Sequence, residues 1–236
     1  QDLFIIVLWA AVFVFVVVEA ALIYILVRYR RRARNSLIPQ THGNTRLEIA
    51  WTIAPAIILL IIAVPTIITL FAVANPKTEP ELEINVTGHQ WWWEFEYPKQ
   101  GIVTANEMHI PRDTVVKLNL RSDDVLHSFW VPKLAGKVDL IPGRTNTMWI
   151  ESEREESFLG QCAEFCGEAH ALMRFRVIAQ SQEDFEDWTL ALKRPASPSQ
   201  DGEAAVGAEL FSQKGCIACH TIEGTIAQGR LGPILT

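Results

Sequence analysis

The sequence is poor in charge over its first third, and residues 49–74 contain no charged side chain at all. An earlier apolar run, residues 3–27, carries a single charge, Glu19. This absence excludes helices exposed to water, and each run exceeds the roughly 20 residues that a helix needs to cross a bilayer. We therefore predict a membrane-spanning helical hairpin within residues 1–75, with spans at about 3–27 and 49–74. Glu19 would be neutral or paired at membrane depth, and the sequence suggests no role for it.

The sequence also lacks an excess of positive charge, since it has 27 acidic and 21 basic residues and a net charge of −6. Binding to phosphate needs a basic face, so nucleic acid is excluded as an expected partner. The charge is uneven, because residues 1–74 hold six arginines and three acids while the remainder is acidic. The acidic remainder favours a basic protein partner.

The arginines of the N-terminal part lie between the two apolar runs, from Arg28 to Arg46. By the positive-inside rule this short loop is cytoplasmic, so everything after Ala74 is expected on the opposite side of the membrane. A cleaved signal peptide is disfavoured, because the first run is too long and its positive charges follow it.

Cysteine is scarce, with four residues in two pairs, Cys162/Cys166 and Cys216/Cys219. A histidine follows each pair closely, which predicts metal or haem binding rather than a disulfide. A short structural disulfide within each pair is the alternative.

The first pair opens a segment that also contains His170 and Met173, and His127 lies upstream of it. Sulfur and imidazole ligands favour copper over magnesium or calcium, and mononuclear blue-copper sites use one cysteine, two histidines and a methionine. Because a second cysteine is present here, two thiolates can bridge two copper ions, each capped by one histidine. The alternative is that Met173 is a core residue and His127 a surface residue.

Residues 81–178 change to short alternating runs separated by proline and glycine, for example 82–87, 114–120 and 147–150. This pattern predicts a β-sandwich or barrel. Residues 194–202 are rich in proline, serine and glycine and are predicted to be a linker. The sequence has no internal repeat.

The second cysteine pair belongs to Cys216-Ile-Ala-Cys219-His220, the attachment signature of c-type haem. Cys216 and Cys219 would form thioethers to haem, and His220 would be the proximal iron ligand. Methionine is also scarce, and the last one is Met173, so the sixth iron ligand is not expected within residues 203–236. We expect these residues to be only the first part of a longer domain.

Four motifs carry a resemblance to a known family: residues 88–97 (GHQWWWEFEY), 124–132 (DVLHSFWVP), 139–144 (DLIPGR) and 162–173. In order and spacing they resemble cytochrome c oxidase subunit II with its dinuclear copper (CuA) site, over roughly residues 3–192. The resemblance implies an all-β, cupredoxin-like Greek-key sandwich over residues 76–193, with the metal loop joining two strands at one end. Residues 203–236 resemble the start of an α-helical class I cytochrome c domain.

The resemblance also implies a ligand set. Cys162 and Cys166 would bridge the coppers, His127 and Met173 would complete one ion, and His170 with the backbone carbonyl of Glu164 the other. The side chain of Glu164 matches a family residue that helps bind magnesium or manganese at the boundary with subunit I. A solvated loop acid is the alternative for Glu164.

Trp91 matches the exposed family tryptophan through which cytochrome c passes electrons to copper, whereas a buried core role is the ordinary alternative. Strand alternation is expected to place Trp91 and Trp93 on one face and Trp92 on the other. Glu96, Asp123 and Asp124 are candidates for an acidic docking patch, with plain solubility as the alternative.

Glu48 matches the family acid near the start of one proton pathway, and stabilisation by the helix dipole is the alternative. The implied function is that of subunit II of a respiratory cytochrome c oxidase in a bacterial plasma membrane. It would relay electrons from cytochrome c, or from its own tethered haem, through copper to haem in subunit I, for O2 reduction coupled to proton pumping.

Other functions remain open at this point. A quinol oxidase subunit II has the same fold without copper. A membrane-anchored copper carrier, a non-catalytic structural subunit and a copper reductase acting on nitrogen oxides are further alternatives.

Overall fold

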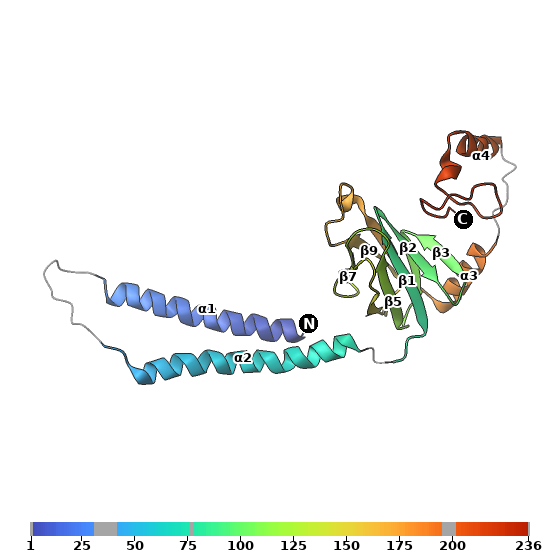
Figure 1. The fold of residues 1–236 in the computed structure, drawn as a ribbon. Helices are drawn as coiled ribbons and strands as arrows, with labels where there is room; N and C mark the ends of the chain where they lie inside the picture. The colour runs from blue at the N-terminus through green and yellow to red at the C-terminus, as the bar shows by residue number, and fades with distance from the viewer. Residues whose placement is uncertain (1, 31–41, 76–77, 195–201, 236) are drawn as a thin grey trace. The chain divides into compact units, whose positions relative to one another are not determined.

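The computed structural model describes residues 2–30, 42–75, 78–194 and 202–235 (Figure 1). It divides into two units, residues 1–77 and 78–236. Most of the arginine-rich loop and of the predicted linker lies outside the described residues, so these two predictions stay untested.

The first unit is a pair of long apolar helices, α1 (Asp2–Arg28) and α2 (Thr45–Ala74), which contact each other. Both are long and apolar enough to cross a membrane, and neither contains a buried residue. Helix α2 begins before the predicted span, because the Asn44 side chain accepts hydrogen bonds from the backbone N–H groups of Arg46 and Leu47. Such a cap satisfies donors that the first turn leaves unpaired.

The second unit begins with a β-sandwich of two five-stranded sheets (Figure 1). In one sheet the strand order is β3-β2-β1-β5-β8, and in the other it is β4-β10-β9-β6-β7. The strands are β1 (Leu82–His89), β2 (Trp92–Tyr97), β3 (Ile102–Ala105), β4 (Glu107–Pro111), β5 (Val116–Ser122), β6 (His127–Trp130), β7 (Val138–Leu140), β8 (Asn146–Ile150), β9 (Glu156–Cys162) and β10 (Arg174–Gln180). The predicted sandwich is confirmed, and its all-β architecture is cupredoxin-like.

The core lies between the two sheets and is built by alternation along the strands. In β2, Trp93, Phe95 and Tyr97 are fully buried while the residues between them are partly exposed. Trp93 packs edge-to-face on Phe129 and at a tilt on Phe175, with ring centroids 5.7 and 5.1 Å apart. These aromatic contacts join the two sheets, and they make the adjacent end of the sandwich rigid.

Two helices follow the sandwich. Helix α3 (Gln182–Leu192) begins at Ser181, whose side chain caps it, and buries Phe185. Helix α4 (Gly202–Gln213) leads to a 3-10 turn, η2 (Cys216–Ala218).

Candidate metal centre

Three connections meet at one end of the sandwich: the β1–β2 turn, the β5–β6 loop and the β9–β10 loop. Strands β1 and β5 run parallel in register up to Gly88 and Ser122, so the segments that follow them start side by side. Strand β6 then begins at His127 and pairs with β9, which ends at Cys162. Gly88 permits this closeness, because a Cβ there would lie 2.8 Å from His127 Cδ2.

The two cysteine sulfurs of this end face each other. Cys162 Sγ and Cys166 Sγ lie 3.8 Å apart, far beyond the S–S bond length of about 2.05 Å. Both residues are buried, and all four cysteines of the chain are free, so neither pair is a disulfide in this structure. Met173, also buried, brings its Sδ within 3.7 Å of Cys166 Sγ.

Both predicted imidazole ligands reach a cysteine sulfur through Nδ1. His127 Nδ1 lies 3.9 Å from Cys162 Sγ, and His170 Nδ1 lies 3.6 Å from Cys166 Sγ. The ligand atoms of His127, Cys162 and Cys166 all fall within 4.8 Å of one another. His127 is fully buried, so it is not the surface residue of the alternative interpretation.

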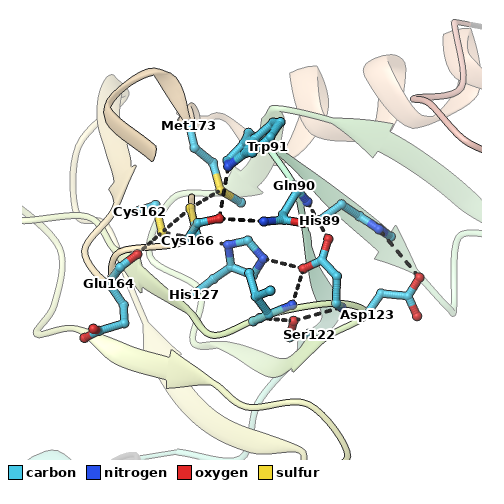
Figure 2. A network of polar contacts seen from close by, with 12 residues as sticks. His89, Gln90, Trp91, Ser122, Asp123, His127, Cys162, Glu164, Cys166 and Met173 are labelled. Atoms are coloured by element: carbon cyan, nitrogen blue, oxygen red, sulfur yellow. Dashed lines mark hydrogen bonds and ion pairs between the residues drawn. The ribbon is translucent and has the colours of Figure 1, made fainter. Parts of the chain in front are cut away.

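The carbonyl oxygen of Glu164 lies 3.1 Å from Cys162 Sγ, while its carboxylate points away from the sulfurs (Figure 2). The structure therefore brings together every ligand that the sequence suggested. Which of these donors would bind which of two copper ions stays a prediction.

The two thiols differ in acidity. Burial raises the pKa of the Cys162 thiol, but the hydrogen bond with His127 and backbone contacts outweigh it, and the pKa falls to about 6. Burial and the nearby Cys162 charge raise the pKa of Cys166 to about 12. One thiolate is thus ready at neutral pH, and metal binding would displace the proton of the other.

A carboxylate orients His127. The His127 Nε2 atom lies 2.8 Å from Asp124 Oδ1, and Asp124 also accepts hydrogen bonds from the backbone N–H groups of Gln90 and Val125, both at 2.6 Å. Burial raises the pKa of Asp124, but the hydrogen bond from His127 and the backbone N–H donors lower it overall. Since Nε2–H is held by Asp124, Nδ1 is the nitrogen left for a metal.

Sequence reasoning missed this role and placed Asp124 in a docking patch. Its position three residues before a candidate histidine ligand was the signal that could have found it. Asp123 is the most exposed member of that patch, with 76% of its side chain accessible against 31% for Asp124, whereas Glu96 accepts a hydrogen bond from Asn85.

The β1–β2 turn contacts the loop between β9 and β10 directly (Figure 2). Gln90 Nε2 and Trp91 Nε1 both donate to the carbonyl oxygen of Cys166, at 2.7 and 3.1 Å. Trp91 is 37% exposed while Trp93 is fully buried. The prediction that they share a face is wrong, because Trp91 lies in the turn before β2 and strand alternation does not apply to it.

The other candidate residues lie elsewhere. Glu48 is in the first turn of α2, in the other unit. Cys216, Cys219 and His220 lie in the C-terminal segment, where His220 Nδ1 is 2.8 Å from the carbonyl oxygen of Pro233. Gly232 packs on the His220 ring, since a Cβ there would lie 2.8 Å from Cε1.

Comparison with known families gives two matches. The transmembrane domain of cytochrome c oxidase subunit II matches residues 1–68, and the periplasmic domain of the same subunit matches residues 99–181. Both regions overlap the part of the chain that carries the sequence resemblance.

Several curated proteins are similar to this chain. Cytochrome c oxidase subunit 2 of Alkalihalophilus pseudofirmus is 43% identical, over 89% of this chain and 63% of that protein. Probable cytochrome c oxidase subunit 2 of Rickettsia bellii is 31% identical, over 80% of this chain and 77% of that protein. Quinol oxidase subunit 2 of Bacillus cereus is 34% identical, over 73% of this chain and 61% of that protein.

Among solved structures, the periplasmic domain of subunit II of cytochrome oxidase from Bradyrhizobium japonicum is 30% identical, with a TM-score of 0.48. The match covers 49% of this chain and 96% of the chain in that solved structure. The chain spans 63% of the length of the Alkalihalophilus pseudofirmus protein.

Proposed function

Because the chain belongs to the cytochrome c oxidase subunit II family, we propose that it accepts electrons at a dinuclear copper (CuA) centre and passes them to haem in subunit I. The two apolar helices anchor it in a membrane, with the β-sandwich outside. The reaction of the assembled complex would be four-electron reduction of O2 to water coupled to proton pumping. A bacterial plasma membrane is the proposed location.

One observation carries this proposal: two buried cysteine sulfurs 3.8 Å apart are contacted by two imidazoles and a thioether. These donors fit copper, since thiolate and thioether sulfur select copper while magnesium and calcium prefer oxygen. The two sulfurs face each other as a bridging pair requires. The relative named as a quinol oxidase is also similar to this chain, so this cluster, rather than overall identity, favours the copper-containing function.

The residues around the sulfurs would hold and insulate the metals. Bound there, two copper ions would take up and release one electron at a time, shared between them. Burial of Cys162, Cys166 and Met173 excludes water from the sulfurs. Asp124 fixes the His127 ring, and the sandwich core supports the strands that bring these ligands together. In a rigid site of this kind, the positions of the ligands change little when an electron enters or leaves.

We propose Trp91 as the side chain that receives electrons from cytochrome c. Its ring is partly exposed, and its Nε1–H donates to the carbonyl oxygen of Cys166. An accessible aromatic ring is therefore joined to a copper ligand through one hydrogen bond. Asp123, the exposed acid of the neighbouring loop, would attract a lysine-rich donor.

Rapid mixing of reduced cytochrome c with the copper-loaded full chain tests this function. We expect fast reduction of the wild-type copper centre and slow reduction in Trp91→Phe, with the two proteins compared at equal copper loading. Trp92→Phe is the matched control, because Trp92 stacks on His89, whereas Trp91 donates to the carbonyl oxygen of Cys166. A copper carrier would instead release its metal to an acceptor and would not be reduced and reoxidised in turn.

A second function, haem binding, is favoured by the geometry of the C-terminal segment. The Nδ1 atom of His220 is taken by Pro233, so its Nε2 is left for iron, and Cys216 and Cys219 are both free. The close packing of Gly232 fixes the His220 ring. We propose that each cysteine thiol adds across one vinyl group of a haem, forming a C–S and a C–H bond with no atom lost.

Haem attachment is checked by producing the full chain in a host that matures c-type cytochromes. We expect haem that stays with the chain after denaturation and acid–acetone extraction. Cys216→Ala together with Cys219→Ala should lose it, while copper binding remains. Extractable haem, or none, in the wild-type chain would contradict this second function.

Two acids complete the proposal. The carboxylate of Glu164, which points away from the sulfurs, would supply one ligand to a magnesium or manganese ion shared with subunit I, as water-rich sites of these ions require few protein ligands. Glu48 would lie near the start of a proton pathway. Its place in the first turn of α2 also suits a carboxylate stabilised by the helix dipole.

A further inference from the structure

Gln90 contacts both halves of the proposed copper centre although it is neither a ligand nor an electron acceptor. We propose that Gln90 is a positioning residue, which fixes the copper loop, residues 163–173, relative to His127. This inference rests on the proposed copper function. It concerns how metal ligands from two segments that are far apart in the sequence are held in fixed positions relative to each other.

The first connection runs from the Gln90 side chain to the copper loop. Its Nε2 donates to the carbonyl oxygen of Cys166 at 2.7 Å. A carbonyl oxygen has two lone pairs, and the second is taken by Trp91 Nε1 at 3.1 Å. The backbone of one bridging cysteine is thus held by two donors from the β1–β2 turn.

The second connection runs from the Gln90 backbone to the other segment. Its N–H donates to Asp124 Oδ2 at 2.6 Å, and Asp124 Oδ1 lies 2.8 Å from His127 Nε2. Three hydrogen bonds therefore link Cys166 to His127 by way of Gln90 and Asp124. Figure 2 shows this path from the Cys166 carbonyl to the imidazole.

The packing beside Gln90 is equally specific. Gly167, directly after Cys166, has φ of +117°, and a Cβ there would lie 3.0 Å from Gln90 Nε2 and 3.1 Å from Trp91 Cζ2. A glycine lets the loop approach the turn closely enough for the amide to reach the Cys166 carbonyl. Gly167 in the loop and Gln90 in the turn therefore both contribute to this contact.

Loss of the Gln90 side chain should loosen one bridging ligand without removing any ligand. Substitution of a residue that forms a hydrogen bond with a metal ligand typically lowers the metal affinity 10- to 100-fold. We expect about 10-fold faster copper loss in Gln90→Leu, because Trp91 still holds the same carbonyl. The copper spectrum should change as well, since the position of Cys166 sets how evenly the two ions share the electron.

The test compares Gln90→Leu with Gln180→Leu in the copper-loaded full chain. Gln180 is a matched control, because its side chain also makes one part-buried hydrogen bond, to His109 Nδ1 at 3.0 Å, but at the far end of β10. Copper transfer to a chelator and the electron paramagnetic resonance spectrum are recorded for each. Faster transfer and altered hyperfine splitting in Gln90→Leu alone would support the proposal. Wild-type behaviour of Gln90→Leu in both measurements would overturn it.

A double-mutant comparison tests the link to His127. If Gln90 joins the two segments, Gln90→Leu and Asp124→Asn should act non-additively on copper transfer, while Gln180→Leu and Asp124→Asn should be additive. Additivity of the first pair would overturn the link. If the first pair is additive but the wild-type chain binds two coppers, the proposed function still stands. If the wild-type chain binds no copper, the proposed function itself is overturned.

Discussion

Cys162 and Cys166 are buried at the end of a β-sandwich, whereas Cys216 is half-buried and Cys219 exposed on a short C-terminal segment. Both pairs are followed closely by a histidine. The first pair gains further ligands and supports from two other connections of the sandwich. The second pair has its histidine adjacent and one carbonyl, that of Pro233, within the same segment.

This difference suggests how each site would be made. A haem brings its own ring of four nitrogens, so the protein needs to supply only attachment points and an axial ligand, and these fit in five residues. Bare copper ions bring no such frame, so every ligand position must come from a folded scaffold. The copper site should therefore depend on residues far away in sequence, and the haem site on local ones.

Cys166→Ser should give the largest effect and separate the two sites. A bridging thiolate is lost, so we expect copper content to fall from two per chain to one or none, with covalent haem unchanged. Cys216→Ser is the reciprocal control, which should keep both coppers. Elemental analysis of the purified full chain checks both, and two coppers in Cys166→Ser would contradict the bridging role.

Asp124→Asn should weaken copper binding by about 10- to 100-fold, mainly because the His127 ring is held less firmly. An amide cannot be the same strong acceptor for the imidazole N–H, so the ring is held less firmly. Its neighbour Asp123 is largely exposed, and Asp123→Asn should leave copper affinity unchanged. Competition with a chelator of known affinity measures both, and equal effects would argue against orientation by Asp124.

Gly167→Ala should destabilise the copper end by about 1–3 kcal/mol, the usual cost of a strained backbone conformation. Its φ of +117° and the approach of Gln90 and Trp91 both oppose a side chain. Gly101→Ala should cost less, because Gly101 has φ of +69° with no atom within 4 Å of the added Cβ. Urea unfolding of the copper-free chain compares them, and a smaller cost at Gly167 would refute the packing account.

The smallest expected effect is a change in the ultraviolet titration of the copper-free chain, which follows from the acidity of the Cys162 thiol. Its pKa of about 6 means that thiolate absorbance of the copper-free chain should appear as pH rises through 6, well below the usual value for cysteine of about 8.5. Cys162→Ser should abolish this step, and Cys166→Ser should retain it. An ultraviolet pH titration that shows no ionisation below pH 8 would contradict the assignment.

The parts that the sequence predicted are those whose signal is local or periodic. Apolar runs indicated α1 and α2, alternation indicated the sandwich, and residue types indicated Cys162, Cys166, His170 and Met173 as a metal set. The role of Asp124 and the position of Trp91 were missed. Both depend on where strands end and which loops meet, because the β1–β2 turn removes Trp91 from the strand period and the parallel pairing of β1 with β5 brings Asp124 to Gln90.

Electron paramagnetic resonance of the oxidised, copper-loaded full chain tests the central claim most directly. If Cys162 and Cys166 bridge two copper ions, the spectrum will show hyperfine splitting from two equivalent copper nuclei that share one unpaired electron. A spectrum of a single copper nucleus, or copper binding without any shared electron, would contradict the dinuclear centre and the electron-accepting function that depends on it.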